Sequence, residues 1–169
     1  MAQITFKSTP MHTSGELPKI GTRAPPFAHL IDSNLKDYSL SDFHGKKKIL
    51  SIVPSLDTAV CSLSAKKFNE AIKEHPEVQV LVISADLPFA QKRICMQENL
   101  MNIKTLSLMR SKEFAQSYGV LIIDGALAGL CARAVIVLDE HDNVIYTELV
   151  HEITNEPNYD KALQSLSLK

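Results

Sequence analysis

The sequence predicts an α/β fold in which helices pack on a central mixed β-sheet. Two short apolar runs, 49–53 and 78–83, have the character of strands that are covered on both faces. Between them, apolar residues recur at near-helical spacing over 60–72, which predicts a helix that crosses from one strand to the next. Near the end of the chain, residues 132–138 and 144–149 flank a polar turn and predict a β-hairpin.

Shorter elements are expected before the first apolar run. Residues 4–6 are predicted to pair with the region that leads to 15–16 as a short hairpin, after which prolines and glycines hold the chain extended. A strand is then expected at 27–31 and a single helical turn at 40–43. The lysines at 46–48 are interpreted as a solvated entry into the first buried strand.

The alternation of strands and helices continues after the second apolar run. Asp86 is expected to cap a helix that has Pro88 in its first turn and ends near Glu98. A weaker strand, a short helix stopped by Gly119, the hairpin and a last helix opening at Pro157 follow. The strand is predicted at 104–108 and the short helix at 112–118. Without repeats or linkers, this order describes a single thioredoxin-like sandwich domain over residues 1–169, extended by the N-terminal hairpin.

Composition narrows the class of function. At 169 residues and 45% hydrophobic, the chain suits one well-buried core. Its net charge of −1 gives no long-range field to recruit nucleic acid or an anionic membrane. It contains no apolar stretch of the roughly 20 residues that a membrane span needs, and its start lacks the pattern of a secretory signal, so a cytoplasmic location is expected. Three cysteines are too few for a disulfide scaffold, and their spacing matches no paired metal-ligand motif.

Cys61 is the main candidate for chemistry. It follows a buried strand and lies at the start of the predicted helix, where Thr58 could act as the N-cap and Cys61 would be the third helical residue. Unpaired backbone N–H groups and the positive end of the helix dipole favour a thiolate at that position. The alternative is that Cys61 is a small buried hydrophobic residue, which is the common fate of a free cysteine.

The residues around Cys61 resemble a known family. Pro54, Thr58 and Cys61 form the pattern Pro-x-x-x-Thr-x-x-Cys, which is similar to that of the peroxiredoxins. The longer string Pro-Ser-Leu-Asp-Thr-x-Val-Cys resembles their thiol peroxidase subfamily, and separate blocks in the same order support this over nearly the whole chain. These blocks are residues 84–91, 93–95, 132–134 and 152–157.

The resemblance implies an antioxidant peroxidase that reduces hydrogen peroxide or organic hydroperoxides. Cys61 would attack the peroxide as a thiolate and become a sulfenic acid, and the Thr58 hydroxyl would face the sulfur or the incoming oxygen. Arg133 interrupts an apolar strand, where a guanidinium needs an anionic partner, and the family assigns it to the thiolate of Cys61. Pro54 would shape the loop and shield the sulfur from water.

The resemblance also implies how Cys61 is recycled. Cys95 would resolve the sulfenic acid as an intramolecular Cys61–Cys95 disulfide, which thioredoxin would then reduce. Because bonded cysteines need Cα atoms within about 7 Å, the segments that carry them are expected to unwind partly. Many relatives have glycine after the resolving cysteine and near Asn99, whereas this chain has Met96 and Asn99, so resolution could be slower. A homodimer is expected, and no metal, haem or flavin is implied.

Other interpretations of these residues remain open. Arg133 could form a structural ion pair, Cys95 could be an ordinary helical residue, and Arg110 is either a second basic group near the site or a solvated surface charge. Cys131 is interpreted as a packing residue. A peroxide sensor that relays oxidation to a partner protein would use the same residues. A general disulfide exchanger would need Cys-x-x-Cys, but Ser64 and Thr58 stand where the second cysteine would be.

Overall fold

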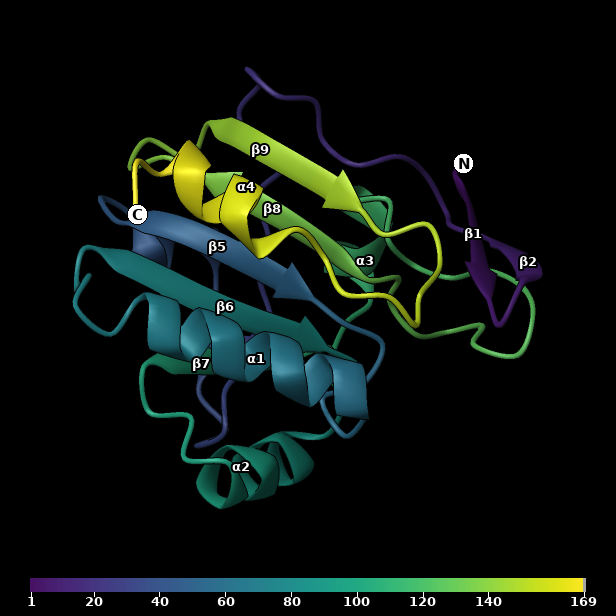
Figure 1. Cartoon of the computed structure of the whole chain (residues 1–169), viewed down its shortest axis with the longest axis horizontal. Helices are drawn as coiled ribbons and strands as arrows, with labels where there is room; N and C mark the ends of the chain where they lie inside the picture. The colour runs from purple at the N-terminus through teal and green to yellow at the C-terminus, as the bar shows by residue number, and fades with distance from the viewer. Residues whose placement is uncertain (169) are drawn as a thin grey trace.

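A computed structural model describes residues 1–168, so Lys169, the last residue of the expected domain, lies outside the described part. Its main feature is a seven-stranded mixed sheet with the strand order β4-β3-β7-β6-β5-β8-β9 (Figure 1). The two strands on either side of β6 run parallel to it, and the other pairs are antiparallel. The strands are β3 (Leu30–Ile31), β4 (Asp37–Tyr38), β5 (Lys47–Ile52), β6 (Val78–Ser84), β7 (Ile103–Ser107), β8 (Ala134–Leu138) and β9 (Val144–Leu149).

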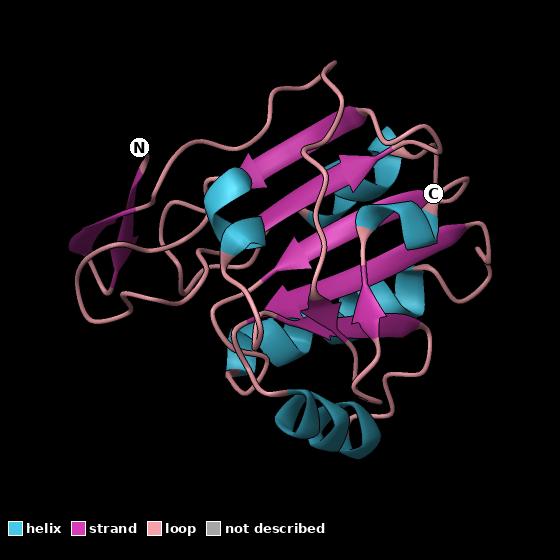
Figure 2. Cartoon of the chain, turned by 180° about the vertical axis from the view of Figure 1, so that it is seen from behind, coloured by secondary structure: helices cyan, strands magenta, loops and turns pink. Residues whose placement is uncertain are grey.

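Helices cover both faces of this sheet. The α-helices are α1 (Ala59–Ala71), α2 (Pro88–Gln97), α3 (Glu113–Ser117) and α4 (Tyr159–Ser165), and the single 3₁₀ turn is η1 (Leu40–Phe43). Buried residues of α1 and α4 pack on one face, and those of α3 and η1 pack on the other. Figure 1 shows α1 and α4 in front of the sheet, with α2 beside them near β7, and Figure 2 gives the opposite view. The predicted sandwich with a mixed sheet is confirmed.

The central strands are apolar because the sheet is buried on both sides. In β5, Ile49 packs on the α1 face, whereas Leu50 and Ile52 pack on the α3 face. Successive side chains of a strand point to opposite faces, so a strand covered on both sides needs a continuous apolar run. The adjacent strand β6 follows the same rule, with Val80 on one face and Leu81 on the other.

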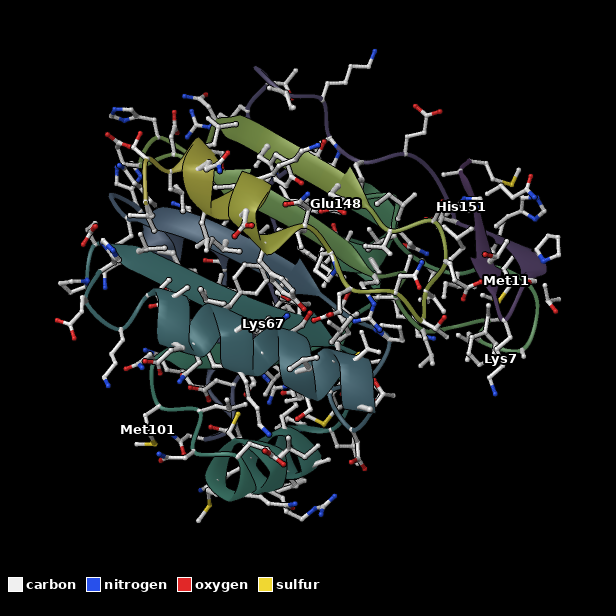
Figure 3. All side chains as sticks on the ribbon, in the orientation of Figure 1. Lys7, Met11, Lys67, Met101, Glu148 and His151 are labelled. Carbon is white, nitrogen blue, oxygen red and sulfur yellow. The ribbon has the colours of Figure 1, made fainter. Side chains whose placement is uncertain are left out.

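The predicted N-terminal hairpin is also present, and it lies apart from the main sheet at one end of the molecule (Figure 1). It pairs β1 (Gln3–Phe6) with β2 (Thr9–His12) in antiparallel register. Lys7 and Ser8 form its tight turn, with φ values of 49° and 65°. Figure 3 shows Lys7 and Met11 on this hairpin and His151 on the neighbouring segment, and the Thr5 N–H donates to the His151 carbonyl over 2.7 Å.

Several predicted boundaries were wrong by a few residues. The strand expected at 27–31 is paired only at Leu30–Ile31, because His29 takes a left-handed φ of 61° that ends the extended segment. The last helix begins at Tyr159 rather than Pro157, since the side chain of Asn158 accepts the Lys161 N–H and caps it.

Two polar residues differ more from their predicted roles. Asp86 does not cap α2, whose N-cap is Leu87. Its carboxylate instead contacts the loop before α1, described below. Lys48 is not solvated but fully buried, because its ammonium lies 2.6 Å from the Asp142 carboxylate and donates to the carbonyls of Phe43 and Lys46.

Candidate active site

Cys61 lies in the first turn of α1, just beyond the carboxyl end of the central strand β5. Thr58 is the N-cap, with an extended backbone, and its hydroxyl oxygen accepts the Cys61 N–H over 3.4 Å. Cys61 is therefore the third helical residue, as predicted, and its side chain is completely buried. The sulfur consequently sits beside the positive end of a thirteen-residue helix and away from bulk water.

Arg133 lies against this sulfur. One guanidinium nitrogen, Nη1, is 3.3 Å from Cys61 Sγ, and Nε donates to the Ile153 carbonyl over 2.9 Å. The side chain is only 3% exposed. Among residues 1–168, no carboxylate lies within ion-pair distance of it, so the alternative of a structural ion pair lacks a partner. An anionic sulfur on Cys61 would compensate this buried positive charge.

The loop between β5 and α1 carries Pro54 and Thr58. Pro54 is buried and has no N–H to present to the sulfur. The Thr58 hydroxyl donates to the Ser55 carbonyl over 3.2 Å, which fixes its rotamer on the same side as the first turn of α1. Pro54, Thr58 and Cys61, which share the stretch 54–61, are thus brought together with Arg133 from a distant part of the chain.

Asp86 supports this loop, a role that the sequence reasoning missed. One carboxylate oxygen accepts the Ser55 hydroxyl and the other accepts the Leu56 N–H, each over 2.7 Å. A signal was available, because Asp86 lies two residues after the end of β6, and the carboxyl ends of the neighbouring parallel strands β5 and β6 meet at one edge of the sheet.

A second set of contacts holds α1 against the segment that follows β9. The Ser64 hydroxyl lies 2.8 Å from the Tyr159 hydroxyl, one helical turn after Cys61. Lys67, labelled at the centre of Figure 3, forms an ion pair with Glu156 over 2.9 Å. Because Ile153 of this segment also accepts from Arg133, the contacts keep the guanidinium and α1 in a fixed relation.

The open space nearest the site is a cleft of about 240 Å³ between the start of α1 and the last turns of α2. Thr58 and Ser62 line it on one side, and Ile94 and Glu98 line it on the other. An ion pair of 3.6 Å between Asp57 and Arg93 crosses the same gap. The cleft thus separates the helix that carries Cys61 from the helix that carries Cys95.

Cys95 is half-buried in the last turns of α2, as predicted, and its thiol is reduced. Burial raises its pKa, and the nearby Thr105 hydroxyl lowers the pKa in part. The carbonyl of Cys95 accepts the Leu100 N–H over 2.9 Å, and Asn99 takes a left-handed φ of 54°. This is a Schellman motif, which closes the helix end that contains the thiol.

The other two candidates lie away from Cys61. Cys131 is fully buried in the core on the opposite face of the sheet, and burial raises its pKa to about 12, so its predicted packing role is confirmed. Arg110 donates to Asp37 over 3.1 Å, at the β4 edge of the sheet. The pKa of Asp37 is lowered first by the hydrogen bond from His29 and then by Arg110. Arg110 is thus half-exposed in a surface ion pair.

Residues 1–168 contain no helix long and apolar enough to cross a membrane. In the same part of the chain, no group of three or more His, Cys, Asp or Glu side chains is arranged to hold a metal ion.

Comparison with known proteins decides the family. The Redoxin family matches residues 19–163. The chain belongs to this family. A thiol peroxidase of Vibrio cholerae is 46% identical over 163 residues, which covers 96% of this chain and 99% of the relative. The protein is therefore a thiol peroxidase of the peroxiredoxin group, and thus an oxidoreductase.

Solved structures agree with this assignment. A peroxiredoxin-like protein from Aquifex aeolicus superposes with a TM-score of 0.92 at 39% identity, over 99% of this thiol peroxidase and 96% of that chain. A thiol peroxidase from Chromobacterium violaceum gives a TM-score of 0.90 at 25% identity, over 98% and 95% of the two chains. The thioredoxin-like peroxiredoxin fold is confirmed.

Proposed function

We propose that this thiol peroxidase uses Cys61 as its nucleophile, with Thr58, Arg133 and Pro54 forming the surrounding site. The observation that carries the proposal is the 3.3 Å contact between Arg133 Nη1 and Cys61 Sγ, made by a guanidinium that is almost fully buried. Such a donor stabilises the thiolate before reaction and the negative charge on the peroxide oxygens during it. Thr58, the N-cap of the helix that carries Cys61, holds its hydroxyl oxygen 3.4 Å from the Cys61 N–H.

The first step transfers one oxygen atom. The Cys61 thiolate attacks one oxygen of hydrogen peroxide or an organic hydroperoxide, the O–O bond breaks, and sulfur is oxidised by two electrons to the sulfenic acid. The second oxygen leaves as hydroxide or alkoxide and takes a proton, giving water or an alcohol. The burial of the sulfur and the proline at position 54 keep bulk water away from the thiolate.

The second stage returns the sulfur to its reduced state. Cys95 attacks the sulfenic acid of Cys61, a disulfide forms, and water is released. A dithiol of the thioredoxin type then reduces this disulfide and is itself oxidised. Since Cys61 and Cys95 belong to different helices separated by a cleft, the first turn of α1 and the end of α2 unwind during this stage. We place this cycle in a single domain of a cytoplasmic homodimer.

The test is consumption of peroxide coupled to thioredoxin by the wild type, Cys61→Ser and Cys95→Ser. Cys61→Ser is expected to lose turnover, and Cys95→Ser is expected to lose only thioredoxin-dependent turnover while Cys61 still reacts once. Cys131→Ala serves as a control, since that thiol lies in the opposite core and should not matter. Full activity of Cys61→Ser would disprove the proposal.

Mass spectrometry of the peroxide-treated protein tests the pairing of the cysteines. An intrachain bridge between Cys61 and Cys95 is expected. A bridge from Cys61 to Cys131, or a dimer linked between chains, would contradict the role of Cys95. A single oxidation without turnover would instead favour a peroxide sensor.

A further inference from the structure

The strongest unassigned polar arrangement in the molecule centres on Asp86. Its carboxylate is partly buried, and within residues 1–168 no lysine, arginine or histidine lies within ion-pair distance of it. It is held by hydrogen bonds alone. Ser55 and Leu56 donate to it from the loop before α1, and the Ser84 hydroxyl donates over 2.6 Å from the end of β6.

The same network continues into the helix that carries Cys95. Ser84 Oγ accepts the side-chain amide of Gln91 over 3.1 Å, and the same amide nitrogen also donates to the Leu106 carbonyl. Gln91 is fully buried in α2, one helical turn before Cys95. Hydrogen bonds therefore run without interruption from the loop that carries Thr58, through Asp86 and Ser84, to α2.

We propose that Asp86 is a positioning residue that latches the two cysteine-bearing segments in their reduced, folded arrangement. The latch fixes the loop for attack on peroxide and opposes the unwinding that brings Cys61 and Cys95 together. This inference rests on the proposed Cys61–Cys95 cycle. It sets how long the sulfenic acid persists, and hence how often a second peroxide converts it to a sulfinic acid with release of another water or alcohol.

The opposing effects on two rates give the test. Asp86→Ala removes the acceptor for the Leu56 N–H and for the Ser55 hydroxyl. The reaction of Cys61 with peroxide is expected to slow about tenfold, and formation of the Cys61–Cys95 disulfide is expected to speed up about tenfold, because each hydrogen bond to a charged group stabilises the latched form. Rapid mixing measures both rates, and mass spectrometry measures the ratio of sulfinic acid to disulfide, which should fall.

Two further variants should change the two rates by smaller amounts than Asp86→Ala does. Ser55→Ala removes one contact and keeps the Leu56 bond, so both rates should shift in the same directions by a smaller factor. Asp86→Asn restores both rates toward the wild type relative to Asp86→Ala, because its amide oxygen can accept from Leu56 while its amide nitrogen donates to the Ser55 hydroxyl. If Asp86→Ala does not fold, the Ser55→Ala and Asp86→Asn pair carries the test.

The matched control is Asp139→Ala. Asp139 also accepts two backbone N–H groups, from His141 and Asn143, but it lies in the β8–β9 turn. It should change neither rate. The inference is overturned if Asp86→Ala shifts both rates in one direction, shifts neither, or matches Asp139→Ala. If the wild type forms no Cys61–Cys95 disulfide, the proposed cycle itself has failed, which is a separate result.

Discussion

At the scale of single residues, the site depends on one buried guanidinium. Arg133 donates to Cys61 Sγ with one nitrogen and to the Ile153 carbonyl with another. Because the guanidinium is planar, these two contacts fix its orientation. A buried cation without a carboxylate costs several kcal/mol unless an anion compensates it. In the proposed function the Cys61 thiolate is that anion.

Arg133→Lys keeps the positive charge but loses the planar guanidinium, which donates with two nitrogens at once. A lysine ammonium on its flexible stem cannot hold both the Ile153 carbonyl and the sulfur in this geometry, so the rate of Cys61 oxidation is expected to fall about a hundredfold. Stopped-flow measurement of the second-order rate with hydrogen peroxide checks this. Arg110→Lys, at the β4 edge, is the control and should react like the wild type. An unchanged rate for Arg133→Lys would show that charge alone is sufficient.

The pKa of Cys95 predicts a pH dependence for disulfide formation. Burial raises it above the ordinary value of 9.0, so at neutral pH the group is a thiol rather than the reactive thiolate. The thiolate fraction, and with it the rate of disulfide formation, should rise about tenfold per pH unit from pH 7 to pH 9. Rapid mixing of pre-formed sulfenic acid at several pH values measures this rate. A flat profile would mean that unwinding, and not ionisation of Cys95, limits the step.

Sequence reasoning found the residues whose signals are local. The spacing of Thr58 and Cys61 at a helix start predicted the cap and the position of the sulfur, and both are confirmed. Asp86 was misinterpreted because a carboxylate before a proline has the same local pattern whether it caps a helix or reaches a distant loop. Its partners in the loop before α1 lie about thirty residues earlier in the chain, a separation that no local pattern encodes.

At the scale of elements, the end of α2 shows how the chain replaces a glycine. Asn99 occupies the left-handed position of the Schellman motif, which glycine fills most often at helix ends. Asparagine tolerates this conformation better than other side chains do. The helix end can thus close at this position without a glycine.

Asn99→Ala should lower the free energy of unfolding by about 1 kcal/mol, because alanine is strained at positive φ. Asn99→Gly should leave it within about 0.5 kcal/mol of the wild type, since glycine adopts this conformation freely. Urea unfolding measures both values. Met96→Ala is the control, as Met96 is exposed on the same helix with ordinary helical geometry. Equal losses for the alanine and glycine variants at position 99 would contradict the backbone explanation.

The N-terminal hairpin is attached through Glu152. Its carboxylate accepts the Thr5 hydroxyl over 2.7 Å and the backbone N–H groups of Lys7 and Ser8. These contacts, that of Thr5 first, lower the pKa of Glu152 to about 2 from 4.5. Because the folded value is the lower one, the stabilisation is complete above pH 4.5 and is lost as the pH falls toward 2.

We expect the amides of Lys7 and Ser8 to lose protection from hydrogen exchange across this pH range, while those of the central strands stay protected. Glu152→Gln should have weak protection at every pH and no such transition. Glu74→Gln, in the exposed turn before β6, is the control and should behave like the wild type. Loss of protection at the same pH in Glu152→Gln would assign the transition to another group.

Elements with strong periodicity were predicted well, and elements that depend on pairing were not. The buried strands β5 and β6 and the helix α1 were recognised because their patterns follow from being covered on one or both faces. The segment at 27–31 has an apolar composition, but only two of its residues find a partner strand, and Phe27 packs into the core instead. Composition alone does not reveal which residues will pair.

At the scale of the whole molecule, one buried ion pair joins two parts of the sheet that are distant in the sequence. Lys48 lies near the start of the central strand β5, and Asp142 lies in the turn between β8 and β9. Both side chains are 5% exposed or less. The lysine run at 46–48 gave no hint of this, because its partner lies more than ninety residues later in the chain.

Asp142→Asn should lower the free energy of unfolding by about 3 to 5 kcal/mol, since it leaves the Lys48 ammonium buried without its counter-ion. Asparagine tolerates the left-handed φ of 66° at position 142, so the loss of stability can be attributed to the missing charge and not to backbone strain. The double variant Lys48→Met with Asp142→Asn should recover most of the stability. Guanidinium unfolding measures each value, and a double variant as unstable as Asp142→Asn would refute the electrostatic cause.

The order of strands in the sheet and the position of α2 beside it are also properties of the whole molecule. Alternating strand and helix signals were sufficient for the fold class, since few architectures bury such a pattern. They did not predict that β8 would lie beside β5, which is what brings Arg133 to Cys61. That juxtaposition follows from the long-range pairing of the sheet.

Ile153 connects the beginning of the chain to the guanidinium. Its N–H donates to the Thr5 carbonyl and its own carbonyl accepts from Arg133, each over 2.9 Å. A purification tag fused ahead of Met1 could therefore disturb β1 and, through Ile153, the position of Arg133. The last helix, α4, lies away from the N-terminal hairpin (Figure 1). Kinetic constants from preparations with and without an N-terminal tag should therefore not be pooled.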